Sequence, residues 1–172
     1  AAVYGDSEEI PKIETMARAP VSPYAIAKAA GEQYVGFYAR HRGLPGVSLR
    51  FFNVFGPGQD PPSPYAAAIP KFVSDLLRGA RPTVFGDGLQ SRDFCPVEDV
   101  VDACVRAGEA PAVGAGEVLN VGRGERLDVL TLVSVIARLL GRDADPVFAP
   151  PRPGDVRHSQ ADVSLARRLL GF

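Results

Sequence analysis

The chain is poor in the residues that build disulfide frameworks, metal sites and membrane spans. It has 172 residues but only two cysteines and two histidines, and no Cys-x-x-Cys pair. Neither a disulfide framework nor a zinc site is indicated, and we expect no bound metal. No apolar run approaches the roughly 20 residues that cross a bilayer. We expect Cys95 and Cys104 to be small buried groups in a protein of the reducing cytoplasm.

Neither sign of charge is in excess. Lysine and arginine total 19 against 20 aspartates and glutamates, and the formal net charge is −1. This balance gives no overall field that would attract nucleic acid or an anionic membrane, so we expect neither as a partner. The length suits one domain or slightly more, which is enough to bury a core.

Helix and strand signals alternate along the chain, which predicts an α/β protein. Ser22 is a favourable N-cap, Pro23 suits the first helical position and Gly43 a helix end, so a helix is expected over 23–42. Further expected elements are helices at 65–78 (kinked or broken at Pro70), 97–107, 130–140 and 163–170, strands at 1–5, 46–52, 83–85, 91–94, 118–121 and 146–148, and loops at 6–21 and 53–64.

Tyr24 and Lys28 lie four residues apart in the first expected helix. Residues at i and i+4 share a helix face. A cation fixed beside a phenol favours the phenolate and lowers the tyrosine's pKa, so the pair can act as a general base toward an alcohol. Chance would produce this spacing in roughly one such chain in ten, so the surrounding motifs must decide its meaning.

Four motifs follow one another in order along the chain. They are Tyr24-x-x-x-Lys28, Arg50-Phe-Phe-Asn-Val-Phe-Gly-Pro57, Gly86-Asp-Gly-Leu-Gln-Ser-Arg-Asp-Phe94 and Arg152-Pro-Gly-Asp-Val156. Together they resemble the extended short-chain dehydrogenase/reductase family, and within it the NAD-dependent nucleotide-sugar 4-epimerases. The resemblance covers essentially the whole chain. It implies the C-terminal part of a Rossmann-like fold with a smaller substrate-binding lobe, NAD as cofactor and a UDP-sugar as substrate.

The resemblance also implies roles for individual residues. Tyr24 would be the catalytic base, Lys28 would bind the nicotinamide ribose, and Phe51 and Val54 would lie near NAD. Guanidinium groups suit phosphate oxygens because they present paired donors. The implied UDP-binding set is Asn53, Arg92 and Arg152 for the diphosphate, Asp155 for the uridine ribose, and Ala67, Ala68, Lys71, Phe72, Thr83, Val84 and Phe85 for the uracil pocket.

Each assignment has a plainer alternative. Phe51 and the phenylalanine after it can be core residues of a strand. Arg92 and Arg152 can instead pair with nearby aspartates at the surface, where ion pairs are worth about 0–1 kcal/mol. Lys71 can be a solvated helix residue. The two histidines have no visible partner and receive no role.

Ala1 and Ala2 bear on which reaction the family resemblance implies. Related dehydratases typically carry Asp-Glu just before Val-Tyr-Gly, and decarboxylases carry a Glu at the second position. Ala1 and Ala2 occupy those positions, so the chain offers no carboxyl group there for either chemistry. C4 epimerisation through a transient 4-keto sugar is therefore favoured, with decarboxylation or dehydration as the alternative.

Ser159 bears on the size of the sugar. The family members restricted to UDP-glucose and UDP-galactose carry a bulky tyrosine at the corresponding position, whereas a serine leaves room for an acetamido group. The segment 154–162 resembles the branch that interconverts UDP-GlcNAc and UDP-GalNAc. The plainer alternative is that Ser159 is merely a small loop residue.

The chain differs from the family pattern at its start. No Gly-rich strand–turn–helix for NAD is present, and the catalytic Ser or Thr expected just before Ala1 is absent. We expect a C-terminal portion that is inactive alone, with 1–55 in the NAD-binding domain and 56–172 mainly in the UDP-sugar lobe. The resemblance also implies a homodimer through the Tyr24 helix, which exposure of Val35 and Phe37 would favour. A non-catalytic nucleotide-sugar binding fragment is a further alternative.

Overall fold

The computed structural model describes residues 1–60, 68–152 and 156–172. It is a mixed α/β structure whose strands are arranged in two-stranded sheets, mostly parallel. In chain order its elements are η1 (Ala2–Tyr4), α1 (Pro23–Arg42), β1 (Gly46–Phe51), β2 (Asn53–Phe55), α2 (Ala68–Leu77), β3 (Thr83–Phe85), β4 (Ser91–Arg92), β5 (Phe94–Pro96), α3 (Val97–Glu109), β6 (Ala115–Val121), β7 (Leu127–Asp128), α4 (Val129–Leu139), β8 (Val147–Ala149) and α5 (Ser164–Leu170).

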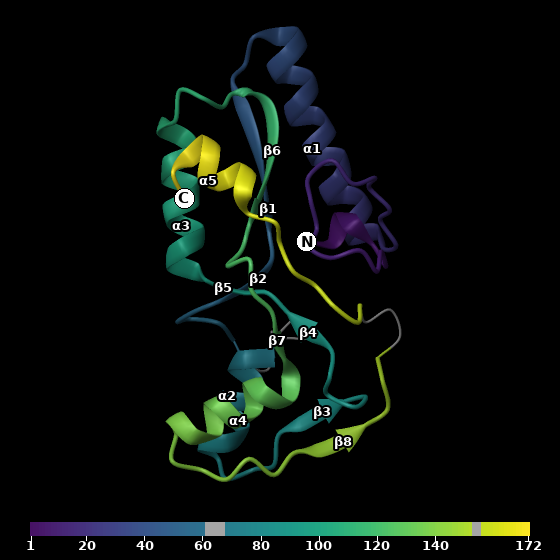
Figure 1. Cartoon of the computed structure of the whole chain (residues 1–172), viewed down its shortest axis with the longest axis vertical. Coiled ribbons are helices and arrows are strands. Elements are labelled where there is room, and N and C mark those ends of the chain that lie inside the picture. The colour runs from purple at the N-terminus through teal and green to yellow at the C-terminus, as the bar shows by residue number, and fades with distance from the viewer. Residues whose placement is uncertain (61–67, 153–155) are drawn as a thin grey trace.

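The parallel pair β1–β6 has helices on both faces (Figure 1). α1 packs along one face, while α3 and α5 lie on the other. Leu119 and Val121 of β6 are fully buried on the side of α3 and α5. On the side of α1 the pair carries two buried polar residues, Arg50 and Asn120.

A second group of elements lies at the opposite end of the molecule and consists of α2, α4 and the parallel pair β3–β8 (Figure 1). α2 and α4 pack together around Phe72, Leu76, Val133 and Ile136. The short pairs β2–β5 and β4–β7 lie between the two groups. Because β2 begins two residues after β1 ends, Asn53 stands where the chain passes from one group toward the other.

Two glycines allow α1 to approach β6 closely. A Cβ on Gly116 would lie 2.8 Å from the Cα of Gly36, which is too short for a real contact. Gly116 also has a φ of +90°, a backbone conformation that other residues rarely adopt. The spacing between the Tyr24 helix and the sheet therefore depends on glycine at this crossing.

The predicted helices are confirmed where the structure describes them. α1 begins after Ser22, whose Oγ accepts a hydrogen bond from the Ala25 amide, and ends at Gly43 in the left-handed conformation. α3, α4 and α5 match the expected segments within about two residues. Of the second helix, residues 68–77 are described, and Pro70 lies in their first turn.

Three expectations about local structure are wrong. Residues 1–5 are not the end of a strand. The amides of Tyr4 and Gly5 donate hydrogen bonds to the carbonyl oxygens of Ala1 and Ala2, which closes a 3₁₀ turn. The run is buried as expected, but burial alone does not distinguish a strand from a turn. Within the expected loop 53–64, Asn53–Phe55 forms β2, because Asn53, Val54 and Phe55 pair with β5. The expected strand 91–94 is instead two strands, β4 and β5, which pair with different partners. The partner of β4, the strand β7, was not expected.

Candidate active site

Tyr24 and Lys28 meet on one face of α1. The Lys28 ammonium lies over the Tyr24 ring, 5.4 Å from its centroid. Tyr24 is 64% exposed, so its hydroxyl is accessible to a substrate rather than committed to the core. The i, i+4 spacing thus produces the predicted phenol–ammonium pair.

This pair borders a cavity of about 460 Å³ between α1 and β1. Phe51, which is 39% exposed, lines the same cavity, as do Glu32 and Arg50. The next residue, Phe52, is buried against Tyr4. Of the two interpretations of the Phe-Phe pair, Phe51 therefore takes the cavity position and Phe52 the core position.

A second cavity, of about 480 Å³, brings together three predicted substrate residues. Asn53, Arg92 and Ser159 line it, together with Ser22 at the start of α1 and the buried Lys12. The residues come from segments far apart in the sequence. We call this space the sugar cavity.

A third cavity, of about 180 Å³, gathers most of the predicted base-binding residues. Its ring is Phe85: the Arg152 guanidinium carbon lies 3.9 Å from the ring centroid and the Lys71 ammonium 5.8 Å from it. Two cations on one aromatic ring make this an electropositive site for a planar or anionic group. We call this space the base cavity, and it is lined by Asn53, Ala68, Lys71, Phe72, Thr83, Phe85, Gln90, Arg92, Phe94, Val129 and Arg152.

Asn53 and Arg92 line both the sugar cavity and the base cavity. A ligand with a planar group at one end and a sugar at the other would therefore pass these two residues at its middle. Two of the three predicted diphosphate-binding residues therefore lie at that junction, whereas the third, Arg152, lines the base cavity alone.

Among the described residues, two of those predicted, Val84 and Val54, do not line these cavities. Val84 is fully buried in the core between α2 and α4, because strand alternation turns it away from Thr83 and Phe85. Val54 packs against the cluster around Cys95. Ala67 and Asp155 lie outside the described residues.

The simple ion pair considered for Arg92 does not fit the position of Asp93. Asp93 is fully buried, and its carboxylate accepts hydrogen bonds from the backbone amides of Arg123, Gly124 and Ala161. The carboxylate therefore joins β5 to two later segments. Arg92 donates to the carbonyl oxygen of Ser91, 2.8 Å away.

The segment around Ser159 is tied to β4. Ser159 donates its amide to the Ser91 carbonyl, and the His158 ring lies 2.8 Å from the Ser91 hydroxyl, so His158 does have a partner. Burial and the nearby arginines lower the pKa of His158. Arg157 grips Asp87 through two hydrogen bonds and holds the pKa of that exposed carboxyl at about 2.

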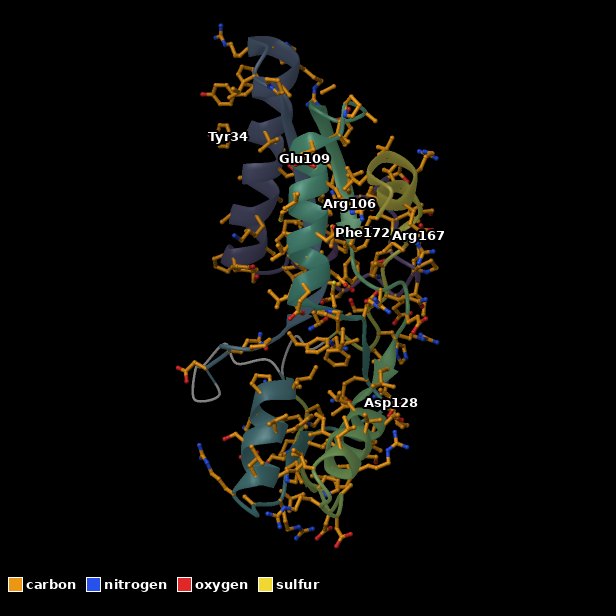
Figure 2. The ribbon with its side chains drawn as sticks, turned by 90° about the vertical axis from the view of Figure 1, so that its left-hand side faces the viewer. Tyr34, Arg106, Glu109, Asp128, Arg167 and Phe172 are labelled. Carbon is orange, nitrogen blue, oxygen red and sulfur yellow. The ribbon has the colours of Figure 1, made fainter. Side chains whose placement is uncertain are left out.

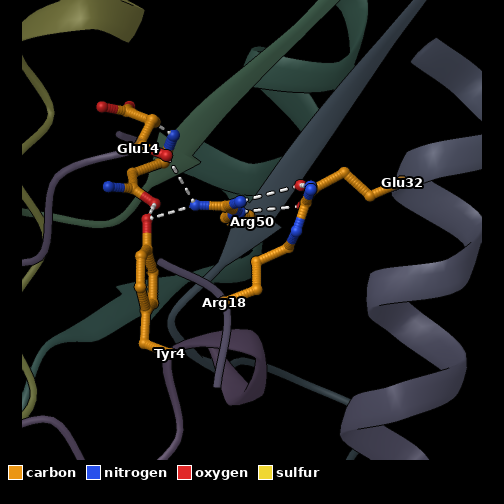
Figure 3. Close-up of polar contacts among 6 residues, drawn as sticks. Tyr4, Glu14, Arg18, Glu32 and Arg50 are labelled. Carbon is orange, nitrogen blue, oxygen red and sulfur yellow. Dashed lines mark hydrogen bonds and ion pairs between the residues drawn. The ribbon is translucent and has the colours of Figure 1, made fainter. Parts of the chain in front are cut away.

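Sequence reasoning missed a buried polar network beside the Tyr24 cavity (Figure 3). The Arg50 guanidinium donates to both oxygens of Glu32, from Nε and Nη2, each at 2.8 Å. Arg18 donates to the same carboxylate at 2.5 Å. Arg50 also donates to the Tyr4 hydroxyl, which in turn donates to Asn120. The partners are distant in sequence, so no local pattern signals them.

The charges in this network stabilise one another. Burial opposes ionisation of Glu32, but hydrogen bonds from Arg50 and Arg18 outweigh burial and hold its pKa below the usual value near 4.5. Burial likewise opposes the charge on Arg50, and its bonds to Glu32 and Tyr4 raise its pKa overall. Burial raises the pKa of Tyr4, which therefore stays a neutral donor.

A larger cavity, of about 660 Å³, lies between α2 and α4 and is lined mainly by apolar residues such as Val73 and Leu132. It shares Arg92 with the sugar cavity and the base cavity, but its described lining contains neither Tyr24 nor Lys28. Size alone therefore does not identify the site; the polar cavities carry the groups that can do chemistry.

The two cysteines lie in different environments. Cys95 is buried, and burial raises its pKa to about 11. Cys104 is exposed on α3, so the expectation that both are buried is wrong for Cys104. Within the described ranges, no three His, Cys, Asp or Glu side chains lie close enough to share a metal ion. No described helix combines the length and the apolar character that crossing a membrane requires.

The model of the NAD dependent epimerase/dehydratase family matches residues 1–122. The chain belongs to this family. Among the relatives of this family member, UDP-glucose 4-epimerase from Mycolicibacterium smegmatis is 42% identical over 170 residues, covering 99% of the chain and 53% of that protein. The resemblance inferred from the motifs is confirmed.

Solved structures support the same membership. A UDP-N-acetylglucosamine 4-epimerase from Methanobrevibacter ruminantium, in complex with UDP-N-acetylmuramic acid, matches with a TM-score of 0.95 and 41% identity over 100% of the chain and 54% of that protein. A UDP-glucuronic acid 4-epimerase from Bacillus cereus, in complex with UDP-glucuronic acid and NAD, matches with a TM-score of 0.90 and 32% identity over 100% of the chain and 53% of that protein. The Rossmann-like extended fold expected from the motifs is confirmed. The chain spans about half the length of the relatives it matches.

Proposed function

We propose that this family member takes part in NAD-dependent epimerisation at C4 of a UDP-hexose or UDP-N-acetylhexosamine. The observation that carries the proposal is the Tyr24–Lys28 pair, which lines one cavity together with Phe51. Asn53 and Arg92 line a second cavity, the sugar cavity. A general base must reach the proton it removes. The exposed phenol is accessible to a substrate, its cavity adjoins the sugar cavity at Ala1 and Ala2, and the Lys28 ammonium over its ring gives the base a cationic neighbour.

The residues around the 460 Å³ cavity fit the nicotinamide end of NAD. A phenol, an ammonium and an aromatic ring (Tyr24, Lys28 and Phe51) face one space there, which suits a ribose hydroxyl and a planar heterocycle. NAD supplies a reversible hydride acceptor for the sugar carbon. Tyr24 takes the proton of the C4 hydroxyl as that carbon becomes a ketone, and it returns the proton when the ketone is reduced from the other face.

The remaining residues hold the nucleotide while the sugar turns. Asn53, Arg92 and Arg152 bind the diphosphate, the first two at the junction of the two cavities, and Lys71 and Phe85 bind the nucleotide base end. Ala1 and Ala2 offer no carboxyl group for dehydration or decarboxylation. With Ser159 in the sugar cavity, we favour UDP-GlcNAc/UDP-GalNAc interconversion, with UDP-Glc/UDP-Gal as additional substrates.

We further propose the domain assignment of residues 1–55 to the NAD-binding domain and 56–172 mainly to the UDP-sugar lobe. The parallel β1–β6 pair supports a return of the later segment to the first domain. The partner is a second copy of the chain, joined through the exposed side of α1. A cytoplasmic location agrees with the two free cysteines.

Replacing Tyr24 by phenylalanine tests the proposal. The test uses the whole protein that the gene encodes, called the encoded protein below. In it, Tyr24→Phe removes the base and should lower kcat for UDP-sugar epimerisation by at least about 100-fold. UDP affinity, measured by calorimetry, should stay within about twofold because the nucleotide residues are untouched. Unchanged turnover in the variant would contradict the proposal.

Calorimetry also separates the second candidate function, a nucleotide-sugar binding module. The base cavity with its two cations on Phe85 favours nucleotide binding whether or not catalysis occurs. Binding of UDP by the encoded protein without any binding of NAD would support the module and count against the epimerase.

A further inference from the structure

The buried charge network beside the Tyr24 cavity does more than fill space. Glu32 stands one helical turn after Lys28 and two turns after Tyr24, so the three share one face of α1. All three line the same 460 Å³ cavity. The helix face that carries Tyr24 and Lys28 therefore also carries a buried carboxylate, that of Glu32.

That carboxylate is held in a fixed orientation. Arg50 binds both of its oxygens at 2.8 Å through a planar fork, and Arg18 binds one of them from the segment that precedes α1 (Figure 3). A two-pronged guanidinium–carboxylate contact fixes angle as well as distance. Glu32 and Arg50 are each at most 8% exposed, so water does not compete for the contact.

The third nitrogen of the Arg50 guanidinium, Nη1, is also held by hydrogen bonds. It donates to the Tyr4 hydroxyl at 2.8 Å and to the Glu14 carbonyl at 3.2 Å, and Tyr4 donates to Asn120 of β6 at 2.6 Å. The residue after Arg50 is Phe51, which lines the same cavity as Tyr24. The network thus ties α1 to β1 beside the cavity that Tyr24 and Phe51 share.

We propose that Glu32 is a positioning residue for the reaction, acting through its bonds to Arg50 and Arg18 to hold Tyr24 and Lys28 in register with Phe51. The inference rests on the proposed function. A buried ion pair is a weak source of stability, and well-packed apolar residues often hold a helix as firmly. What apolar contacts lack is orientation, and a displacement of about 1 Å in a reacting group can cost about 100-fold in rate.

The test replaces the pair without leaving a lone buried charge. The double variant Glu32→Met/Arg50→Met of the encoded protein should keep its melting temperature within a few degrees but lose between about 10- and 100-fold in kcat. Its KM for the UDP-sugar should stay within about twofold, because Asn53 and Arg92 are untouched. Full kcat in the folded double variant overturns the inference, as does a loss that appears only in KM or only in melting temperature.

Further variants keep the outcome interpretable. If the double variant does not fold, Arg18→Met removes only the half-exposed arm of the clamp and should lower kcat by a few-fold with KM unchanged; an unaltered kcat overturns the inference. Asp102→Asn breaks the exposed Arg106–Asp102 pair on α3 and should change neither constant. Tyr24→Phe in parallel separates the two hypotheses: retained turnover there rejects the proposed function, whereas normal kcat in the Glu32 and Arg18 variants alone rejects only the positioning role.

Discussion

Under the proposed function, a single residue, Ser159, sets the choice of sugar. It lines the sugar cavity with Asn53 and Arg92, and its backbone is anchored because its amide donates to Ser91 at 3.0 Å. A side chain placed there cannot move aside easily. Its volume therefore subtracts directly from the space open to a sugar substituent.

We predict that Ser159→Tyr in the encoded protein lowers kcat/KM for UDP-GlcNAc by more than about 10-fold and spares UDP-glucose. A pocket can reject a group by this much through loss of room alone. The measurement is the ratio of the two kcat/KM values, and Ser159→Ala, which keeps the space open, serves as the control. Equal loss on both sugars would contradict the prediction.

At the level of elements, the crossing of α1 and β6 depends on glycine. We predict that Gly116→Ala lowers the free energy of unfolding by about 1–3 kcal/mol, because the added Cβ meets the Gly36 backbone and φ is positive. Chemical denaturation measures the change. Gly108 on α3 has open space around its Cα, so Gly108→Ala should stabilise by about 0.5–1 kcal/mol. Equal effects of the two substitutions would mean that the helix–strand spacing is not fixed.

Element boundaries were predictable where a residue type fixes them locally. Ser22 and Gly43 determine the ends of α1 through capping and a left-handed backbone, and both act within four residues. The strands β2 and β7 were not predictable, because runs of two or three residues show no period and form only when a distant strand pairs with them. The 3₁₀ turn at Ala2–Tyr4 was missed for a related reason: a run of three residues, two of them buried, fits several backbone conformations.

In the candidate site, too, the residues related by local spacing were predictable from the sequence, and those related only by packing were not. Tyr24 and Lys28 were found because helical spacing relates them. Alternation implied that Phe51 and Phe52 face opposite sides, but only packing shows which one reaches the cavity. The Tyr4–Asn120 bond spans 116 positions, and the sequence offers no signal for such a contact.

The outer side of α1 matters for the whole molecule. Ile26, Tyr34, Phe37 and Tyr38 are between 44% and 67% exposed there, and Tyr34 projects away from the body (Figure 2). Val35, whose exposure would have favoured a dimer, lines the 460 Å³ cavity and is half-buried. A row of exposed aromatic side chains is typical of an association surface.

We predict that Tyr34→Glu/Phe37→Glu weakens self-association of the encoded protein by at least about 10-fold in Kd, because charge replaces aromatic anchors. Sedimentation velocity over a concentration series measures it. The control, Val101→Glu/Val105→Glu, adds the same two charges at positions on α3 that are 56% and 53% exposed. A self-association constant that is unaltered by the α1 changes would place the contact elsewhere.

The two ligand cavities differ greatly in size, about 180 Å³ for the base cavity and about 480 Å³ for the sugar cavity. Under the proposed function, the nucleotide base is bound in a small cavity, while the hexose has enough room in the larger one to rotate between its two orientations. Discrimination among hexoses then falls on a few residues at the wide end, such as Ser159. Such an enzyme can acquire a new sugar by exchanging one or two side chains, leaving its nucleotide grip intact, so the architecture favours rapid divergence of specificity.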